Sequence, residues 1–224
     1  MSDLTPRERY EALFTGTIDD GKRQIALGHA LDIRKFEIAL YWTRATYFWT
    51  FIGAALVAYG AVRTLPGTEK NDFSVFVSCL GFLFSFAWYC VNRGSKYWQE
   101  NWENHVDLLE DSVAGPLYKV VIRRAPAGKW YQKLGTHLTG PHPFSVSKIN
   151  QIISLYVTGF WVLLVWYSLE SSVDISAMYV AVVVLTALAA SAFVTLGRTH
   201  RSSHRIVAEV RETILDGLEP RPKA

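Results

Sequence analysis

The sequence predicts an all-α membrane protein with four transmembrane helices, helical cytoplasmic extensions and a small β-hairpin. Half of the residues are hydrophobic, but charged side chains avoid four windows. Each window holds about 18–22 residues, the length at which a helix crosses a hydrocarbon core. A soluble helix of this length would keep a polar face, and these windows keep none. They are Ala45–Val62, Phe73–Val91, Ile152–Leu169 and Ile175–Leu196.

The four windows divide the chain into spans and connections. We expect N-terminal helices in 1–35, the first span in 36–63 and a loop in 64–72. The second span is expected in 73–92, followed by a helix with a hairpin and loop in 93–150. The third span is expected in 151–169, a loop in 170–174, the fourth span in 175–197 and a tail helix in 198–224.

The distribution of basic residues predicts the orientation. Lys and Arg number six up to Lys35, eight in Arg93–Lys148 and six from Arg198 onward. They number only two in Arg63–Asp72 and none in Glu170–Ser176. Because basic loops stay on the cytoplasmic side of a membrane, both termini and the long loop are expected in the cytoplasm. The two short loops are then periplasmic.

The N-terminal segment favours helices that lead into the membrane. The run Thr5–Glu8 carries a helix-start signal, and a second helix is expected to begin within 17–20 and to continue through the first span. Neither a cleavable signal peptide nor a lipidation motif is visible. Arg44 either snorkels to the lipid headgroups or pairs with a buried acid such as Glu37, seven residues earlier.

The second span is expected to continue as a helix well beyond the membrane. No turn signal follows it until Gly115, so the helix should reach about Ser112. Next, Leu117–Arg124 is β-branched and partly alternating, and a turn separates it from 129–134, which suggests a hairpin. Apolar residues four apart in the tail predict one more amphipathic helix.

The stretch Arg93–Asp111 raises the main question about function. On a helical wheel one face holds four residues with spacing 4, 3, 4, namely Trp98, Trp102, His105 and Leu109, while acids occupy the far side. This spacing is typical of a seam between helices. A helix lying on anionic lipid is disfavoured by the acidic face. A metal site from Glu103, His105 and Asp107 is disfavoured because these residues do not share a face.

Small and basic residues indicate two further surfaces. Gly53 in the first span, and Ala187 and Ser191 in the fourth, would let helix backbones approach closely, either within one subunit or between subunits. Basic residues at the ends of the spans are expected to form a collar that meets anionic headgroups. The collar residues are Arg44, Arg198, Arg201 and Arg205.

No pattern points to an enzyme, a cofactor or a bound metal. Nucleophile motifs, phosphate loops and dinucleotide fingerprints are missing from the sequence. No Asp, Glu, Lys or Arg lies within the four windows, which argues against ion-coupled transport. An oligomeric pore remains an alternative. Its lining would be the small polar side chains Ser78, Ser85, Thr158, Thr186, Ser191 and Thr195.

Several runs resemble a known family: "FEIALYWTRATYFWTFIGAALVAYGA", "CLGFLFSFAWYCVNRGSKYWQENWENHVDLLED" and "GPLYKVV". They are similar to the RipA-like family of octameric bacterial cytoplasmic-membrane proteins, over roughly Phe36–Val121. The resemblance implies a homo-octamer in the bacterial inner membrane, and it brings no catalytic residues.

Taken with the pattern, the resemblance favours a non-enzymatic scaffold or regulator in stress or host adaptation. The expected partners are other copies of the chain, membrane lipids and a cytoplasmic protein. Nucleic acid is not expected, because the basic residues are interleaved with acids.

Overall fold

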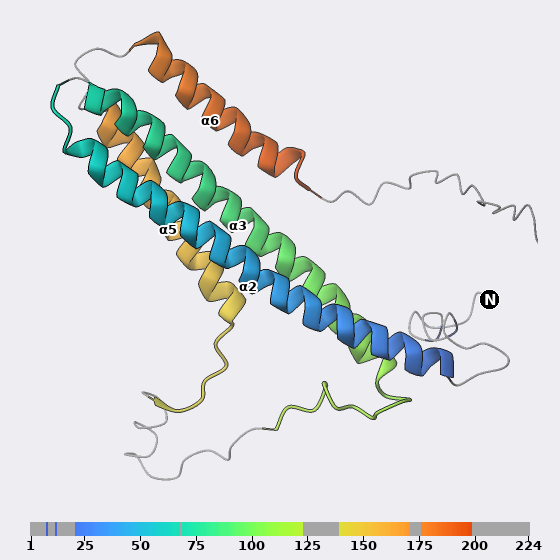
Figure 1. Ribbon diagram of the computed structural model, residues 1–224. Helices are drawn as coiled ribbons and strands as arrows, with labels where there is room; N and C mark the ends of the chain where they lie inside the picture. The colour runs from blue at the N-terminus through green and yellow to red at the C-terminus, as the bar shows by residue number, and fades with distance from the viewer. Residues whose placement is uncertain are drawn as a thin grey trace, which may run out of the picture.

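The computed structural model describes residues 21–67, 69–122, 139–170 and 176–198, together with Glu8 and Ala12. These residues form four helices and no strand: α2 (Gly21–Arg63), α3 (Glu69–Leu109), α5 (Val146–Glu170) and α6 (Ala177–Thr195) (Figure 1). All four are long and apolar enough to cross a membrane. The predicted all-helical fold with four spans is therefore confirmed for the described part of the chain.

Two very long antiparallel helices organise the structure. α2 has 43 residues and α3 has 41, so each is roughly 60 Å long, about twice the thickness of a hydrocarbon core. They lie side by side along their length, and α3 also contacts α5 and α6 (Figure 1). α3 is thus the central helix. It continues from the second span to Leu109, close to the predicted end at Ser112.

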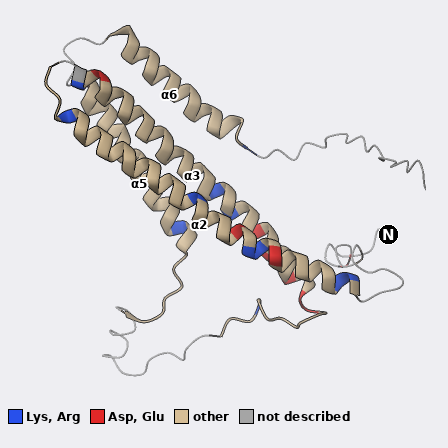
Figure 2. Ribbon diagram, in the orientation of Figure 1, with Lys and Arg blue, Asp and Glu red and all other residues tan. Residues whose placement is uncertain are grey.

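Charge marks the part of the helices that suits a lipid environment. Figure 2 shows Lys, Arg, Asp and Glu at one end of the helices and again beyond their middle, with an uncharged zone between. This uncharged slab comprises 45–62 of α2, 73–92 of α3, 149–169 of α5 and 177–195 of α6. At 1.5 Å per residue each stretch is roughly 27–32 Å long, which matches a hydrocarbon core.

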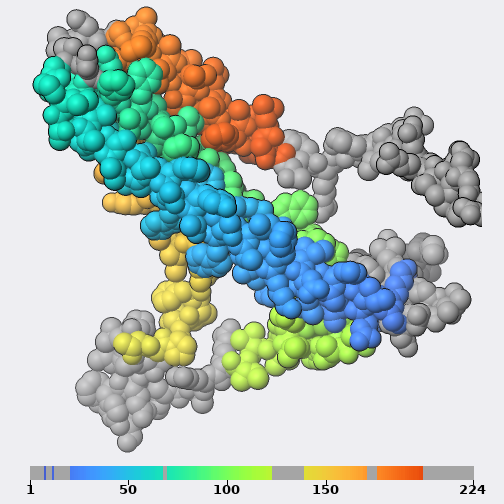
Figure 3. Space-filling view, in the orientation of Figure 1, coloured from blue at the N-terminus to red at the C-terminus, as the bar shows by residue number. Residues whose placement is uncertain are grey.

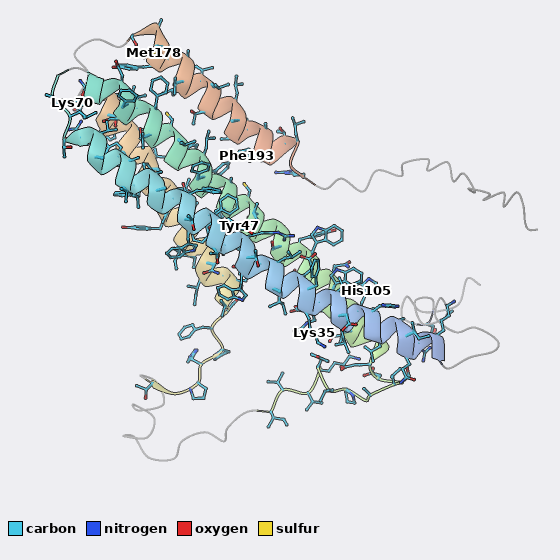
Figure 4. The ribbon with its side chains drawn as sticks, in the orientation of Figure 1. Lys35, Tyr47, Lys70, His105, Met178 and Phe193 are labelled. Atoms are coloured by element: carbon cyan, nitrogen blue, oxygen red, sulfur yellow. The ribbon has the colours of Figure 1, made fainter. Side chains whose placement is uncertain are left out.

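Beyond the slab, α2 and α3 continue alone as a paired-helix stalk. We define the stalk as 21–43 of α2 and 93–109 of α3. It extends roughly 25 Å past the slab along α3. Figure 4 labels Lys35 on α2 and His105 on α3 in this part, while Lys70 and Met178 mark the opposite end of the molecule.

The fourth span is attached mainly through its first turns. Ser176 caps α6 by accepting a hydrogen bond from the Tyr179 amide. The buried Tyr179 ring packs with Val75 and Cys79 of α3, and its hydroxyl donates to Asp72. Most of the remaining α6 surface is exposed (Figure 3). α6 therefore offers the largest unpartnered face of any span.

A glycine on α3 permits a close contact between α3 and α5. Trp161 of α5 is fully buried, and a Cβ added at Gly81 would lie too close to atoms of its indole ring for van der Waals contact. The Tyr59 ring of α2 meets the same indole edge-on, with centroids 6.2 Å apart. Gly81 and Trp161 thus fix the distance between α3 and α5.

Two predicted helices lie outside the described residues. These are the short helix from Thr5 to about Phe14, of which only Glu8 and Ala12 are described, and the tail helix of 198–224, of which only Arg198 is described.

We expect Gly81→Ala to lower the free energy of unfolding by about 1–3 kcal/mol, because the new methyl group would overpack the Trp161 pocket. Thermal unfolding in mild detergent, followed by far-ultraviolet circular dichroism, measures the change. Gly159→Ala on α5 is the matched control, since a Cβ there meets nothing within 4 Å. Equal stability of the two variants would contradict the close contact.

Candidate functional site

One stripe of α3 packs against both α2 and α5. Its positions recur at alternating steps of four and three, the spacing that keeps one helix face against a partner. Within the slab the stripe is small or polar except for Trp88, and in the last two turns of the stalk it is apolar. We call it the α3 seam, and its residues are Ser74, Ser78, Gly81, Ser85, Trp88, Asn92, Ser95, Gln99, Trp102, Val106 and Leu109.

The serines of the seam are buried and use their own helix as a hydrogen-bond partner. Ser78 and Ser85 are 0% exposed, and their hydroxyls donate to the Val75 and Gly81 carbonyl oxygens over 3.0 and 2.9 Å. On α5, buried Thr158 donates in the same way to the Ser154 carbonyl oxygen over 2.7 Å. Hydroxyls satisfied in this way need no water and let helices pack closely in lipid.

Polar contacts across the slab tie α5 to its neighbours. The Asn92 Nδ2 atom of α3 lies 3.5 Å from the Ser154 hydroxyl of α5, and both side chains are buried. The Tyr59 and Ser168 hydroxyls lie 3.1 Å apart near the other end of α5. Asn150 donates to the Tyr41 hydroxyl of α2 over 2.8 Å. In a low-dielectric environment such bonds select one arrangement of the helices.

The stalk has a small hydrophobic core of its own. Leu27 and Ala30 of α2 and Val106 and Leu109 of α3 are buried together, with Trp102 packed against them. Each buried aliphatic side chain contributes roughly 1.5–3 kcal/mol. This apolar packing in water replaces the small-residue packing found in the slab.

Ion pairs cross the stalk beside this core. Glu103 of α3 lies 3.7 Å from the Arg34 guanidinium of α2 and 3.4 Å from Lys96 Nζ. Lys96 Nζ also lies 3.5 Å from Glu100. Because these groups are partly exposed, each pair contributes little individually. Of these three pairs, Arg34–Glu103 joins α2 to α3, whereas both Lys96 pairs lie within α3.

Arg44 lies where the stalk meets the slab and forms contacts within the subunit. Its Nη1 atom donates to the Ser95 hydroxyl over 3.0 Å and lies 3.7 Å from the Glu37 carboxylate. Of the two alternatives for Arg44, the structure has the pairing with Glu37. The side chain stays partly exposed, so contact with lipid headgroups remains a prediction.

A buried carboxylate holds the turn that follows α3. Glu110 is 1% exposed and accepts hydrogen bonds from the Tyr118 and Lys119 amides over 2.8 and 3.2 Å. The Arg34 guanidinium lies over the Tyr118 ring, 5.3 Å from its centroid. The chain is thus folded back against the stalk.

The hairpin predicted from the sequence is not confirmed. The described part of its first strand, 117–122, contains no strand. The Tyr118 and Lys119 amides bind Glu110, and the Val120 amide bonds the Pro116 carbonyl oxygen, so they are not available to a ladder. Residues 123–138, including the return strand 129–134, lie outside the described residues.

The structure separates the four residues of the predicted aromatic face. Trp102 and Leu109 lie in the α2–α3 contact. The Trp102 and His105 rings are 5.3 Å apart, and His105 is half-buried. Trp98 is 40% exposed. The packed stripe is rotated toward Ser95 and Val106, which leaves Trp98 on the outer surface of the stalk.

The other predicted surface residues lie apart from one another. Gly53 on α2 has open space where a Cβ would be, and Ala187 and Ser191 on α6 are exposed. None is used for packing within the subunit, so their role between subunits stays a prediction. Arg198 is exposed just after α6, whereas Arg201 and Arg205 lie outside the described residues.

The described part of the chain shows no cluster of metal ligands. Among the described residues, no three His, Cys, Asp or Glu side chains come together as metal ligands would.

The sequence interpretation missed the α3 seam, although the alternating four-and-three spacing of small polar residues in the second span was available as its signal.

Comparison with known proteins gives one match. The octameric membrane protein family (8xMP) matches residues 24–170, which is more than half of the chain. The matched range includes the stalk and the spans of α2, α3 and α5 and ends before α6. No curated protein and no solved structure gives a significant match.

We expect Glu110→Ala to release the turn, because two amides would lose a charged acceptor. Amide hydrogen exchange at Tyr118 and Lys119 should become about tenfold faster or more. Mass spectrometry of peptides over 110–122 measures it. Glu100→Ala removes an exposed acid from α3, away from the turn; it is the control and should leave this exchange unchanged. Unchanged exchange in Glu110→Ala would contradict the role given to the carboxylate.

Proposed function

The chain belongs to the octameric membrane protein family, and we propose that it works as a non-enzymatic scaffold or regulator. In this proposal the spans anchor a homo-oligomer in the bacterial inner membrane, and the stalks together form a docking surface in the cytoplasm. The continuity of α2 and α3 carries the proposal, because two membrane helices extend as one packed rod roughly 25 Å beyond the slab.

The outer surface of the stalk supports a role in assembly. Ile25 and Phe36 are 62% and 60% exposed on α2. They are eleven residues apart, about three helical turns, and therefore share a face. Large apolar side chains gathered on one face in water favour a contact with another protein surface. The exposed Trp98 ring adds to the apolar surface of the stalk.

The basic residues support a cytoplasmic stalk. Arg93 and Lys96 follow the slab on α3, Lys148 precedes it on α5, and Arg198 follows it after α6. The opposite end carries Arg63 and Lys70. More positive charge thus lies on the stalk side, which favours that side as the inner one.

The alternative function, an oligomeric pore, receives less support. Of its proposed lining residues, Ser78 and Ser85 are 0% exposed, Thr158 is 6% and Thr186 is 9%. Their hydroxyls donate to carbonyl oxygens of their own helices. Only Ser191 and Thr195 on α6 are exposed, and they too bond their own helix.

We expect the double variant Ile25→Ser, Phe36→Ser to reduce the number of subunits per particle in mild detergent. Burial of each side chain between subunits would contribute roughly 1.5–3 kcal/mol, and serine removes most of it. Native mass spectrometry gives the subunit count, and circular dichroism should show unchanged helix content.

Lys35→Ser provides the control, because Lys35 is also exposed on α2 but lies roughly 80–100° around the helix from the two apolar residues. It should leave the subunit count unchanged. An intact oligomer in the double variant would show that this face is not an assembly surface.

A further inference from the structure

A groove opens between α3 and the end of α6 at the boundary of the slab. Its volume is about 500 Å³, and it lies where the uncharged stretches of the two helices end. Figure 4 labels Phe193 at this end of α6. The walls combine charged, aromatic and small side chains, including Arg93, Gly94, Tyr97, Trp98, Phe193 and Arg198.

Two guanidinium groups give the groove its charge. Arg93 comes from α3, and Arg198 comes from the residues just after α6, so the two guanidinium groups come from different segments of the chain. The Arg93 guanidinium lies over the Tyr89 ring, 5.7 Å from its centroid. No Asp or Glu is among the described residues that line the groove. Guanidinium groups are well suited to bind the oxygens of a phosphate group.

The rest of the groove suits the glycerol and upper acyl chains of a lipid. Phe193 stacks on Phe86 of α3 with centroids 6.5 Å apart, and this apolar wall continues into the slab. Tyr97 and Trp98 lie on the stalk side, where aromatic rings meet the headgroup region. A free phosphate ion would bind the arginines but leave this apolar wall uncovered.

We propose that this groove binds one anionic phospholipid per subunit, with its phosphate between Arg93 and Arg198 and its acyl chains along α3 and α6. The lipid would fill the space where α6 and α3 separate and so hold the otherwise weakly attached fourth span. This inference does not depend on the proposed scaffold function, since it concerns a single subunit in the membrane.

The test is a lipid titration of the purified oligomer in mild detergent, read by native mass spectrometry. Phosphatidylglycerol should bind at one molecule per subunit and at least about tenfold more tightly than phosphatidylcholine with the same chains. The double variant Arg93→Gln, Arg198→Gln should weaken phosphatidylglycerol binding roughly thirtyfold. Lys148→Gln removes the same kind of charge from α5, outside the groove, and should have no effect.

Three results would overturn the proposal. One is equal binding of the two lipids by the unmodified protein. A second is an equal loss of phosphatidylglycerol in the double variant and in Lys148→Gln. A third is displacement of phosphatidylglycerol by inorganic phosphate at equal concentration, which would assign the groove to a free anion.

A steric variant separates lipid binding from folding. A Cβ at Gly94 meets nothing within 4 Å, so Gly94→Leu should fill the groove while leaving both arginines and the helix intact. We expect loss of phosphatidylglycerol with unchanged subunit count and helix content. Gly60→Leu on α2 has equally open space outside the groove and should keep the lipid. Full phosphatidylglycerol binding by Gly94→Leu would contradict the proposal.

Discussion

The requirement that α3 pack along one face in two different solvents shapes the rest of the structure. In lipid, apolar side chains gain little by leaving their surroundings, so close contact needs small residues and internally bonded hydroxyls. In water, burial of apolar surface is the main driving force. The α3 seam changes accordingly, from Ser74, Ser78, Gly81 and Ser85 in the slab to Val106 and Leu109 in the stalk. Asn92, Ser95 and Arg44 lie at the transition.

Because one seam continues through both solvents, the spans and the stalk form a single mechanical unit. α5 is fixed to α3 by Gly81, Trp161 and the Asn92–Ser154 contact. Movement of the stalk would therefore displace the packing of the spans, and the reverse also holds. Such coupling suits a scaffold that presents its docking surface in a fixed geometry. α6 is the exception, since it is attached mainly near Tyr179 and leaves the lipid groove at its other end.

The positions of the helices could be predicted from the sequence because charge avoidance in lipid is strict. In α2, α3 and α5 each slab boundary coincides with a charged residue visible in the sequence, such as Arg44, Arg63, Asp72 or Arg93. The continuation of α3 also followed from the lack of a turn signal before Gly115, which adopts a positive φ of 72°. These features depend on composition and local conformation alone.

The rotation of each helix and the path after α3 could not be predicted in this way. A serine in a span reads equally well as pore lining or as packing surface, and only the neighbouring helix decides between them. The sequence interpretation put Trp98 on the packed face of the stalk. The Ser95–Arg44 contact shows that the packed face lies to one side of Trp98. The β-branched run after Pro116 predicted a strand, yet the buried Glu110 carboxylate binds its amides. The rotation of the helices and the path of the chain after α3 both depend on contacts between residues that are separated in sequence or lie on different elements.

The most direct test of the seam is an engineered disulfide between Asn92 of the α3 seam and Ser154 of α5, the residue that Asn92 contacts. The Asn92 Nδ2 atom lies 3.5 Å from the Ser154 hydroxyl oxygen within one subunit, so Asn92→Cys with Ser154→Cys should cross-link inside a single chain. Cys79 and Cys90 would first be replaced by alanine. After oxidation in membranes, denaturing electrophoresis should show monomers, with the linked peptides found by mass spectrometry. Disulfide-linked dimers would contradict the account, because they would place the polar seam between subunits.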